Sequence, residues 1–367
     1  MRTMSPQSHR RCWVEVDLDA LRTNVAVIRR RIGRAKLMAV VKADAYGHGL
    51  APVARTLRHC GVDAFAVANL TEAVALRQAV GPDPVILQFG AAFLFEIDAL
   101  LAHNITPTIS SLAEAKLFEQ SARRVNAHVE IDTGMGRCGF WHTEAGPALQ
   151  QLAALPHLQI TGVYTHFPSA DENLTETRRQ LADFLAVARD YPNLHAANSA
   201  ALLNLPEAAL DMVRPGLALY GIASGAADFA PVLSFKARVA HVKTVAAGRT
   251  ISYGQTFVAP TAMRIATVAA GYADGFNRHL SHKAEVLCAG QRCRLVGRVT
   301  MDQIMVDVTN APSVACGDEV VFIGRQDSAA ITADEVAGWA GTIAWEVLCG
   351  INQSVRVPRL YLGAEPV

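Results

Sequence analysis

The sequence predicts an α/β fold, an eight-stranded (β/α)8 barrel (TIM barrel) followed by a smaller and mostly antiparallel β domain. Over about 220 residues, short β-like apolar runs alternate with amphipathic helical patterns. Past residue 230, strand patterns follow one another without helices between them, and Gly-rich turns separate them. The length of 367 residues agrees with two domains.

Eight apolar runs in the first part are the candidate barrel strands, and helical patterns separate most of them. A helix precedes them, with Leu21, Val25, Ile28 and Ile32 on one face and Asp17 and Asp19 as its capping signal. The clearest later helix spans 174–189. The predicted strands are 37–42, 64–68, 85–88, 106–109, 127–131, 160–164, 194–197 and 211–214.

The second part begins near residue 231. We predict a barrel domain over 13–230 and a β domain over 231–367, which the N-terminal segment 1–12 joins. A helix is expected over 331–339 and a last strand over 354–362. The other strands expected in the β domain are 234–245, 264–269, 284–288, 303–308 and 318–323.

Composition narrows the class of function. The chain is 51% hydrophobic and 18% charged, and its 34 basic and 33 acidic side chains leave a net charge of +1. This balance argues against nucleic acid or an anionic membrane as the main partner and favours a small molecule. The seven cysteines contain no CxxC pair, so we expect reduced thiols and no metal site. No apolar run approaches the roughly 20 residues of a membrane span, and no apolar region follows the basic N-terminus, so a cytoplasmic location is expected.

The end of the first barrel strand carries the most unusual side chain. There the apolar run MAVV ends in Lys42, which Ala-Asp-Ala-Tyr-Gly-His-Gly follows. Taken alone, a lysine at a strand end is more often a side chain that reaches water. A partly buried lysine at a barrel mouth has a lowered pKa instead, and it can form a Schiff base with a carbonyl group.

The loops after strands seven and eight carry groups that suit a phosphate. Asn198 and Ser199 follow strand seven at a predicted helix start, and Arg214, Gly216 and Leu217 follow strand eight. Seryl hydroxyls and backbone N–H groups at helix N-termini bind anions, and barrels commonly bind phosphate at these two loops. Each motif alone is typical of an ordinary cap or turn. Together with a Schiff-base lysine, they predict pyridoxal phosphate as the cofactor.

Two further side chains follow strands five and six. Arg137 ends the segment 132–137 (DTGMGR), where a guanidinium can hold the carboxylate of an amino acid substrate through two parallel hydrogen bonds. His166, in YTHF, can stack on a planar ring, although a lone histidine is more often structural. An amino acid is therefore the expected substrate.

In seven motifs the chain resembles the bacterial alanine racemases, and the resemblance covers essentially its whole length. In chain order the motifs are AVVKADAYGHG (39–49), DTGMGRCG (132–139), YTHF (164–167), NSA (198–200), VRPGLALYG (213–221), GYADG (271–275) and GRVTMDQ (297–303). The resemblance implies a racemase that interconverts L-alanine and D-alanine through a pyridoxal-phosphate aldimine. It also implies the supply of D-alanine for peptidoglycan as the physiological role.

The resemblance implies a role for each matching residue. Lys42 would carry the cofactor and act as the base at the α-proton of the D-enantiomer, and Tyr272 would be the opposite base, acting on the L-enantiomer. Two bases are needed because the proton leaves one face of a planar carbanion and returns on the other. Arg137 and Met301 would contact the substrate, and His195 and Asp302 would support the site. The residues that would contact the cofactor are Tyr46, His166, Asn198, Ser199, Arg214, Gly216 and Leu217.

The resemblance also implies a homodimer, because in that family the β domain of one subunit completes the barrel mouth of the other. The chain departs from the family at two positions. Many members have a carbamylated lysine where this chain has Glu130, whose permanent carboxylate could support the site by pairing with Arg137. Many also have a tyrosine directly before Arg-Val-Pro, where this chain has Val355 in a longer segment. A wider entrance could then admit serine or a larger side chain.

Three alternatives stay open beside alanine racemisation. A serine or broad-specificity amino acid racemase would use the same residues. A barrel-type decarboxylase would favour an acidic group at the pyridine nitrogen of the cofactor, and Arg214 speaks against it. A pyridoxal-phosphate carrier would need the barrel alone, so the β domain with Tyr272 and Met301 makes it the least favoured.

Overall fold

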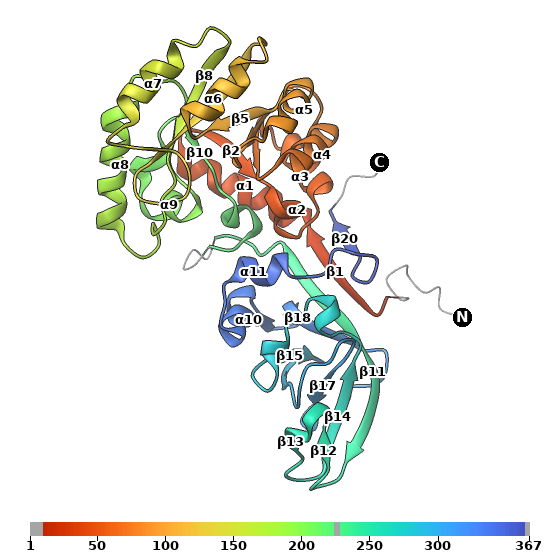
Figure 1. The fold of residues 1–367 in the computed structure, drawn as a ribbon. Coiled ribbons are helices and arrows are strands. Elements are labelled where there is room, and N and C mark those ends of the chain that lie inside the picture. The colour runs from red at the N-terminus through yellow and green to blue at the C-terminus, as the bar shows by residue number, and fades with distance from the viewer. Residues whose placement is uncertain (1–9, 224–227, 364–367) are drawn as a thin grey trace. The chain divides into compact units, whose positions relative to one another are not determined.

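The computed structural model describes residues 10–223 and 228–363 and divides into two compact units (Figure 1). The barrel unit comprises Ala20–Ala45 and Gly49–Ala230. The β unit comprises the described part of Met1–Asp19, the short stretch Tyr46–His48, and Pro231–Val367. Two stretches that the expected boundaries assign to the barrel, 13–19 and 46–48, therefore group with the β unit.

The barrel unit is a closed circle of parallel strands, which confirms the predicted fold. In the described ranges the strand order is β5-β4-β3-β2-β10-β9-β8-β6, and pairing of β5 with β6 closes the circle. Each of the eight predicted strands overlaps one of these. Their bounds are β2 (Lys36–Val40), β3 (Ala64–Val67), β4 (Val85–Gln88), β5 (Thr106–Ile109), β6 (Val125–Asp132), β8 (Leu158–Tyr164), β9 (Leu194–His195) and β10 (Met212–Val213), with the short β7 (Phe140–Trp141) beside β6.

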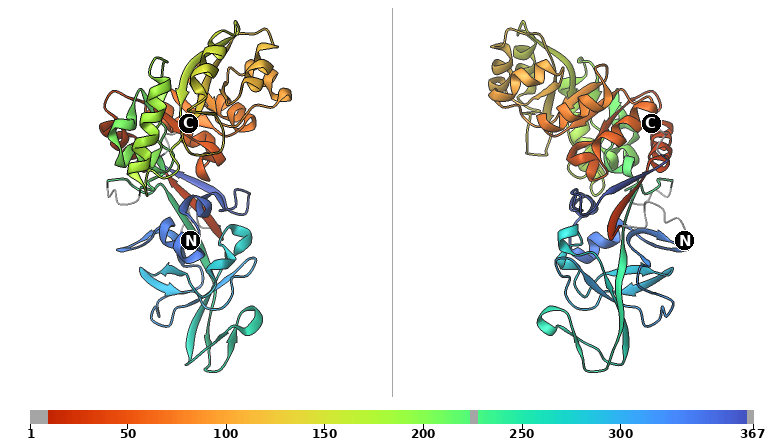
Figure 2. Two further views of the ribbon diagram at one scale, coloured as in Figure 1. Left: turned by 60° about the vertical axis from the view of Figure 1, so that its left-hand side comes forward. Right: turned by 90° about the vertical axis from the view of Figure 1, so that its right-hand side faces the viewer.

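Helices flank the barrel strands (Figure 2). Several begin at an Asn or Ser side chain that accepts a backbone N–H three residues later, as Asn69, Ser111 and Asn173 do. The helices are α1 (Leu18–Ile32), α3 (Leu50–His59), α4 (Leu70–Val80), α5 (Ile97–Ala102), α6 (Leu112–Glu119), α7 (Ala145–Ala153), α8 (Leu174–Ala188) and α9 (Ser199–Asn204), with 3-10 turns η2 (Leu94–Glu96), η3 (Pro206–Ala209) and η4 (Leu217–Tyr220).

The β unit is built on a sheet in the order β16-β15-β18-β11-β1-β20, to which β14, β17 and β19 add further pairings. Among its described strand pairs only β1 with β20 is parallel, so the mostly antiparallel prediction is confirmed. The elements are β1 (Cys12–Asp17), β11 (Leu233–Val245), β12 (Thr250–Ile251), β13 (Phe257–Val258), β14 (Met263–Val268), β15 (Glu285–Cys288), β16 (Gln291–Arg294), β17 (Ile304–Asp307), β18 (Glu319–Gln326), β19 (Ala329–Ile331) and β20 (Arg359–Leu362), with α10 (Ala333–Ala340), α11 (Ala344–Cys349), η5 (Tyr253–Gln255), η6 (Tyr272–Asp274) and η7 (Arg278–Leu280).

The predicted last strand, 354–362, is wrong over its first half. Asn352 accepts the backbone N–H of Ser354 on its side chain, which turns the chain, and only β20 (Arg359–Leu362) is a strand. Several elements were not predicted, among them the N-terminal strand β1, the strand β16 and the helix α11.

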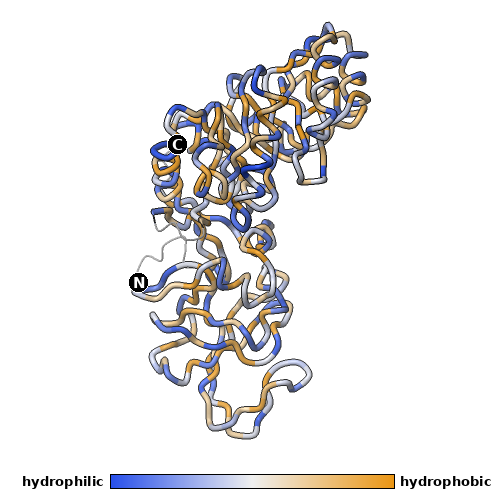
Figure 3. The backbone as a smooth tube through the Cα atoms, turned by 90° about the vertical axis from the view of Figure 1, so that its left-hand side faces the viewer, coloured by the Kyte–Doolittle hydropathy of each residue, from blue (hydrophilic) through white to orange (hydrophobic). Residues whose placement is uncertain are grey.

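Each unit has its own apolar interior. In the barrel unit the predicted helix face Leu21, Val25, Ile28 and Ile32 is buried, and Figure 3 shows apolar and polar stretches alternating along the chain in both units. A fully buried side chain of this size contributes roughly 1.5–3 kcal/mol to folding. In the part of the chain that the structure describes, every helix is too short or too polar to cross a bilayer.

Candidate active site

Lys42 stands beyond the carboxyl end of β2, at the start of a left-handed turn, which Figure 1 labels α2 (Lys42–Tyr46). Ala43, Asp44 and Ala45 have φ of 52° to 55° and ψ of 48° to 52°. For residues other than glycine this region costs roughly 1–2 kcal/mol per residue. Such strain persists only where the surroundings hold it, and it is common at functional sites. The predicted strand 37–42 is therefore wrong at its end, because β2 stops at Val40.

Arg214 directly follows β10 and is 3% exposed. Its Nη1 donates to Nδ1 of His195 (2.9 Å) and to the His195 carbonyl (2.7 Å). Its Nη2 donates to the carbonyls of Thr165 (2.7 Å) and Ala196 (3.3 Å). Burial lowers its pKa to about 10, so the guanidinium stays charged at neutral pH. Among the described residues no acceptor faces its Nε–H, so one fixed donor is left for an acceptor such as a pyridine nitrogen.

Two buried histidines extend the hydrogen-bond chain behind Arg214. A guanidinium can only donate, so His195 accepts on Nδ1 and carries its proton on Nε2. That Nε2–H then donates to Nδ1 of His128 at 2.9 Å, which leaves the proton of His128 on its Nε2. Burial and the charge of Arg214 lower the pKa of His195 well below its ordinary value and that of His128 to about 4. Both rings are therefore neutral at pH 7.

Tyr164 connects this chain to Glu130. Its ring stacks on His195 with centroids 4.9 Å apart, and the guanidinium of Arg214 lies 5.0 Å from its centroid. Its hydroxyl donates to Oε2 of Glu130 at 3.1 Å and lies 3.1 Å from Oγ1 of Thr108. Burial raises the pKa of Glu130, and the hydrogen bond from Tyr164 works against that rise. Glu130 is thus a buried acceptor within the aromatic and cationic cluster.

The expected pairing of Glu130 with Arg137 is not formed. Glu130 is 4% exposed, Arg137 is exposed, and no ion pair joins them among the described residues. Asp132 explains the separation, because it accepts the backbone N–H groups of Gly134 (2.8 Å) and Gly136 (2.9 Å) and folds the DTGMGR segment into a turn of its own. Arg137 affects Glu130 only as a secondary influence that lowers the pKa of the carboxyl.

His166 lies where the cations of the barrel unit meet. Burial, and after it the charges of Arg214, Arg137 and Lys42 in that order, lower its pKa to about 3. Since all three charges act on one imidazole, the fold brings Lys42, Arg137, His166 and Arg214 into one neighbourhood. A cationic surface of this kind suits a ligand that carries a phosphate and a carboxylate.

Ser199, at the start of α9, faces the turn after β10. Its Oγ accepts the backbone N–H groups of Gly216 (3.0 Å) and Ala218 (3.1 Å). With both N–H groups accepted, the hydroxyl proton is left to donate. Leu217 begins η4, where a backbone N–H has no partner within the helix. These two donors suit a phosphate oxygen, so the residues present fit the predicted cofactor.

Asn198, predicted to contact the cofactor, has a structural role. Its Oδ1 accepts the backbone N–H of Ala201 at 2.9 Å, and its Nδ2 donates to the carbonyl of Phe167 at 3.2 Å. It therefore caps α9 and ties the loop after β8 to it.

Tyr272 begins η6 in the β unit and is 43% exposed. Its backbone N–H donates to the carbonyl of Thr300, and that of Ala273 donates to the carbonyl of Met301, both at 3.0 Å. Only glycine fits at position 271, because a Cβ on Gly271 would lie 2.2 Å from the Thr300 carbonyl oxygen. The GYADG and GRVTMDQ motifs thus form one surface that carries Tyr272 and Met301.

Arg356 ties the same two motifs together. Its Nε donates to Oδ1 of Asp274 (3.0 Å), and its Nη2 donates to Oδ1 of Asp302 (2.7 Å). Asn352, in the lengthened segment, donates to the Ala273 carbonyl at 2.8 Å. Val355, directly before Arg356, is 97% exposed. Asp302 thus holds Arg356 and the loop around it.

Tyr46 belongs to the β unit with its neighbours Gly47 and His48. Gly47 has a φ of +80°, and a Cβ there would lie 2.6 Å from the Leu348 carbonyl oxygen. Arg359 donates through Nε to the Gly47 carbonyl at 3.0 Å and holds this loop. Burial raises the pKa of Tyr46, so its phenol stays protonated and able to donate.

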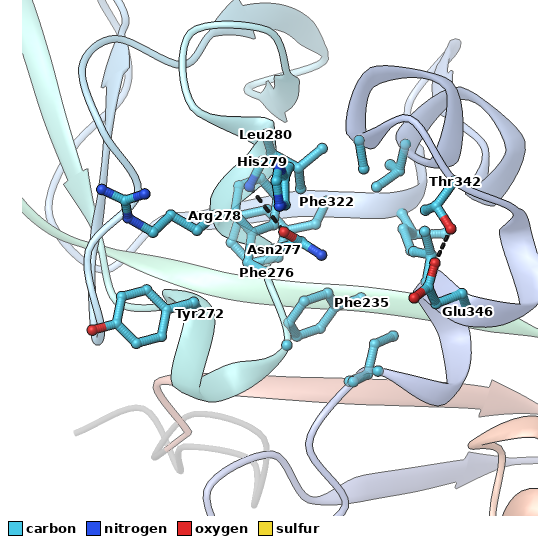
Figure 4. A pocket seen from close by; sticks show the side chains of 17 residues that line it. Phe235, Tyr272, Phe276, Asn277, Arg278, His279, Leu280, Phe322, Thr342 and Glu346 are labelled. Atoms are coloured by element: carbon cyan, nitrogen blue, oxygen red, sulfur yellow. Dashed lines mark hydrogen bonds between the residues drawn. The ribbon is translucent and has the colours of Figure 1, made fainter. Parts of the chain in front are cut away.

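A cavity of about 490 Å³ lies beside Tyr272 within the β unit. The rings of Phe235, Phe276 and Phe322 line it, and Figure 4 shows the phenol of Tyr272 pointing away from them. Thr342 and Glu346, joined by a hydrogen bond, border its other side.

Sequence reasoning missed His128, Thr108 and Tyr164, although a signal for two of them was present. Side chains two residues apart on a strand point to the same face. His128 therefore shares a face of β6 with the candidate Glu130, and Tyr164 shares a face with the candidate His166 that follows β8.

Comparison with known proteins decides the family. The family model described as "Alanine racemase, N-terminal domain" matches residues 16–224, and the one described as "Alanine racemase, C-terminal domain" matches residues 232–361. The chain belongs to the alanine racemase family. The alanine racemase of Carboxydothermus hydrogenoformans is 42% identical, over 95% of this chain and 99% of its own length. That of Symbiobacterium thermophilum is 43% identical, over 96% and 97%.

Solved alanine racemases share the fold. That of Streptomyces coelicolor A3(2) superposes with a TM-score of 0.91 at 33% identity, covering 98% of this chain and all of its own (100%). That of Bacillus anthracis, described with bound L-Ala-P, gives 0.87 at 37% identity and covers 96% and 95%. The chain is accordingly an isomerase that racemises alanine.

Proposed function

We propose that this alanine racemase binds pyridoxal phosphate at Lys42 and uses Lys42 and Tyr272 as its two bases. The observation that carries the proposal is the set of donors in the barrel unit. Within the described ranges Arg214 keeps one N–H without an acceptor, Ser199 keeps a hydroxyl proton, and three cations act on His166.

Arg214 would donate its Nε–H to the pyridine nitrogen of the cofactor. When bound, pyridoxal phosphate withdraws electrons from the α-carbon of an amino acid and makes its proton acidic. Because the guanidinium stays charged, it disfavours a second positive charge on that nitrogen. His195 and His128 fix the guanidinium in this orientation. The arrangement favours removal and return of the α-proton over transamination.

The remaining residues bind and transfer protons. Ser199, the backbone N–H of Leu217 and the phenol of Tyr46 would hold the phosphate, and Arg137 would hold the substrate carboxylate. Lys42 would take the α-proton of the D-enantiomer on one face, and Tyr272 would take that of the L-enantiomer on the other. After one base has removed the α-proton on its face, the other donates a proton on the opposite face, so both enantiomers form.

Tyr272 and Met301 would serve the site of a second copy of the chain. They are 43% and 52% exposed, and Ile343 and Trp345 of the same unit are exposed as well. Large exposed apolar side chains mark an interaction surface where they lie together in one patch. We infer a homodimer in which each active site takes Lys42 from one subunit and Tyr272 from the other.

Reductive trapping tests the cofactor site. The protein is reconstituted with pyridoxal phosphate, reduced with borohydride and mapped by peptide mass spectrometry. We expect the label on Lys42, and no label on this peptide in Lys42→Ala. A label on another lysine, or none in the wild type, would overturn the proposal. Incubation with L-alanine must in addition give D-alanine.

A broad-specificity racemase is the second candidate, and one observation favours it. Val355 replaces the family tyrosine and is 97% exposed, so no phenol stands at that place to narrow the entrance. Parallel assays with L-alanine and L-serine decide between the candidates. Comparable kcat/KM values support broad specificity, whereas a strong preference for alanine excludes it.

The cell compartment and role are inferred from chemistry. All seven cysteines lie in the described part of the chain and are free thiols, as expected in the reducing cytoplasm. We propose that the enzyme acts there to supply D-alanine for peptidoglycan. Rescue of a bacterial strain that requires D-alanine is the test, and failure of an expressed, active enzyme to rescue would contradict this role.

A further inference from the structure

We propose that Glu72 is a positioning residue for Lys42, because its carboxylate holds the left-handed turn that follows the lysine. The inference rests on the proposed role of Lys42 and adds a residue that no motif contains. Oε1 of Glu72 accepts the backbone N–H of Ala43 at 2.8 Å, and Oε2 accepts that of Ala68 at 2.8 Å. One carboxylate thereby joins the loops that follow β2 and β3.

The position of Glu72 is itself well defined. It is the third residue of α4, and its backbone N–H donates to Oδ1 of Asn69, the helix cap, at 3.0 Å. The strands before the two loops are also in register, with Met38 opposite Ala64 and Val40 opposite Ala66. The carboxylate is therefore attached to a regular, hydrogen-bonded part of the barrel.

Within the turn the N–H of Ala45 donates to the Val41 carbonyl at 2.9 Å, and Glu72 adds the tie from a neighbouring loop at the lysine end. The far end of the turn is held by Asp44, whose carbonyl accepts the N–H of Gly49 (2.9 Å) and whose Oδ1 accepts that of Leu50 (2.6 Å). The first left-handed residue, Ala43, directly follows Lys42, and Glu72 accepts its N–H. Loss of this bond allows Ala43 to relax toward ordinary φ values, which would redirect the Lys42 side chain.

Ionised glutamate suits this task and glutamine does not. A carboxylate offers two acceptor oxygens, and hydrogen bonds to a charged acceptor are stronger than neutral ones. In Glu72→Gln one oxygen becomes an NH2 group, which is a donor. Either Ala43 or Ala68 would then lose the acceptor of its backbone N–H. The substitution keeps the size of the side chain and removes one of its two functions.

The chain offers a matched control in Glu114. It is the third residue of α6, which Ser111 caps, and it accepts the N–H groups of Ala92 and Ser110, each at 2.9 Å. It joins the loops after β4 and β5 in the way that Glu72 joins those after β2 and β3. Glu114 is 7% exposed, so Glu114→Gln should disturb folding at least as much, but it leaves the lysine turn intact.

Hydrogen–deuterium exchange of the cofactor-free protein is the first measurement. We expect the amides of 43–46 to exchange at least about tenfold faster in Glu72→Gln, a change equivalent to ~1.4 kcal/mol, because a bond to a charged acceptor is lost. In Glu114→Gln the faster exchange should be confined to the loops with Ala92 and Ser110. Glu72→Ala removes both acceptor oxygens, so unchanged exchange at 43–46 in this variant would overturn the proposal.

The second measurement is the rate at which pyridoxal phosphate becomes attached to Lys42, followed by borohydride trapping over time. We expect this rate to fall about tenfold in Glu72→Gln and to stay near the wild-type value in Glu114→Gln. Equal losses in both variants would show a general structural effect and contradict the positioning role. Trapping at another lysine in the wild type would instead contradict the proposed function, whatever the exchange data show.

A rescue variant keeps the test decisive if Glu72→Gln folds poorly. Glycine adopts the left-handed region without the penalty that alanine has. Adding Ala43→Gly to Glu72→Gln should therefore restore several-fold of the lost attachment rate. If the added glycine brings no gain in a folded double variant, strain in the turn is not what Glu72 offsets, and the proposal is wrong.

Discussion

Lowering the pH from 7 to 4 should destabilise the fold through His128. Its folded-state pKa is about 4, whereas an exposed histidine titrates near 6.5. The folded state binds fewer protons than the unfolded one between these values, so its stability is complete above pH 6.5 and falls as the pH falls toward 4. At about 1.4 kcal/mol per unit, the difference amounts to roughly 3 kcal/mol. His166 and His195 act in the same direction, because their pKa values are lowered too.

Two buried carboxyls oppose this trend. Burial raises the pKa of Glu114 and Glu130, so their contribution to stability is present at acid pH and is lost as the pH rises through their folded-state pKa values. The pH dependence of the free energy of unfolding of the whole protein is therefore smaller than the contribution of His128 alone. A comparison of variants at each pH isolates it.

The assay is urea unfolding at pH 7, 6 and 5, at one protein concentration, for the wild type and His128→Asn. The amide oxygen of asparagine can accept the proton of His195 Nε2 without titrating. Below pH 6.5 the wild type should lose up to about 1.4 kcal/mol per pH unit more than the variant. Equal slopes for the wild type and His128→Asn would refute this reasoning.

Three further predictions concern the reaction and its support. Tyr272→Phe should abolish formation of D-alanine from L-alanine, while borohydride labelling of the protein persists. If the protein were only a carrier of the cofactor, the substitution would change nothing that can be measured. Racemisation near the wild-type rate in this variant would exclude Tyr272 as a base. Gly162→Ala places a Cβ 2.7 Å from the His128 ring, and the resulting overpacking should lower stability by about 1–3 kcal/mol in thermal unfolding; an unchanged Tm would contradict it. Glu130→Gln should raise KM for alanine only by roughly threefold, because no ion pair joins Glu130 to Arg137; a hundredfold rise in steady-state assays would indicate a direct pairing.

Much of the fold could be predicted because its elements carry strong local signals. The barrel strands are short apolar runs between helices, and caps such as Asn69 and Ser111 mark where the helices begin. The turn after Lys42 has no such signal. Left-handed backbone is usually marked by glycine, but here Ala43, Asp44 and Ala45 adopt it, and tertiary hydrogen bonds hold them there.

The residues of the site likewise include some that the sequence could predict and some that it could not. Motifs indicated the residues that carry functional groups, among them Lys42 and Arg214. Their partners depend on strand register, which single-sequence patterns do not contain. On β6 and β8, His128 pairs with Gly162, and the missing side chain of Gly162 leaves the space that the imidazole occupies. The expected pairing of Glu130 failed for a related reason, since a neighbouring strand supplies the hydroxyl that it accepts.

Complementation between two inactive variants tests the central claim most directly. Lys42→Ala and Tyr272→Phe are given different tags and co-expressed, and the mixed dimer is purified through both tags. If each site takes Lys42 from one subunit and Tyr272 from the other, one of the two sites in the mixed dimer is intact, and about half of the wild-type racemase activity returns. A purified mixed dimer without activity would contradict the account.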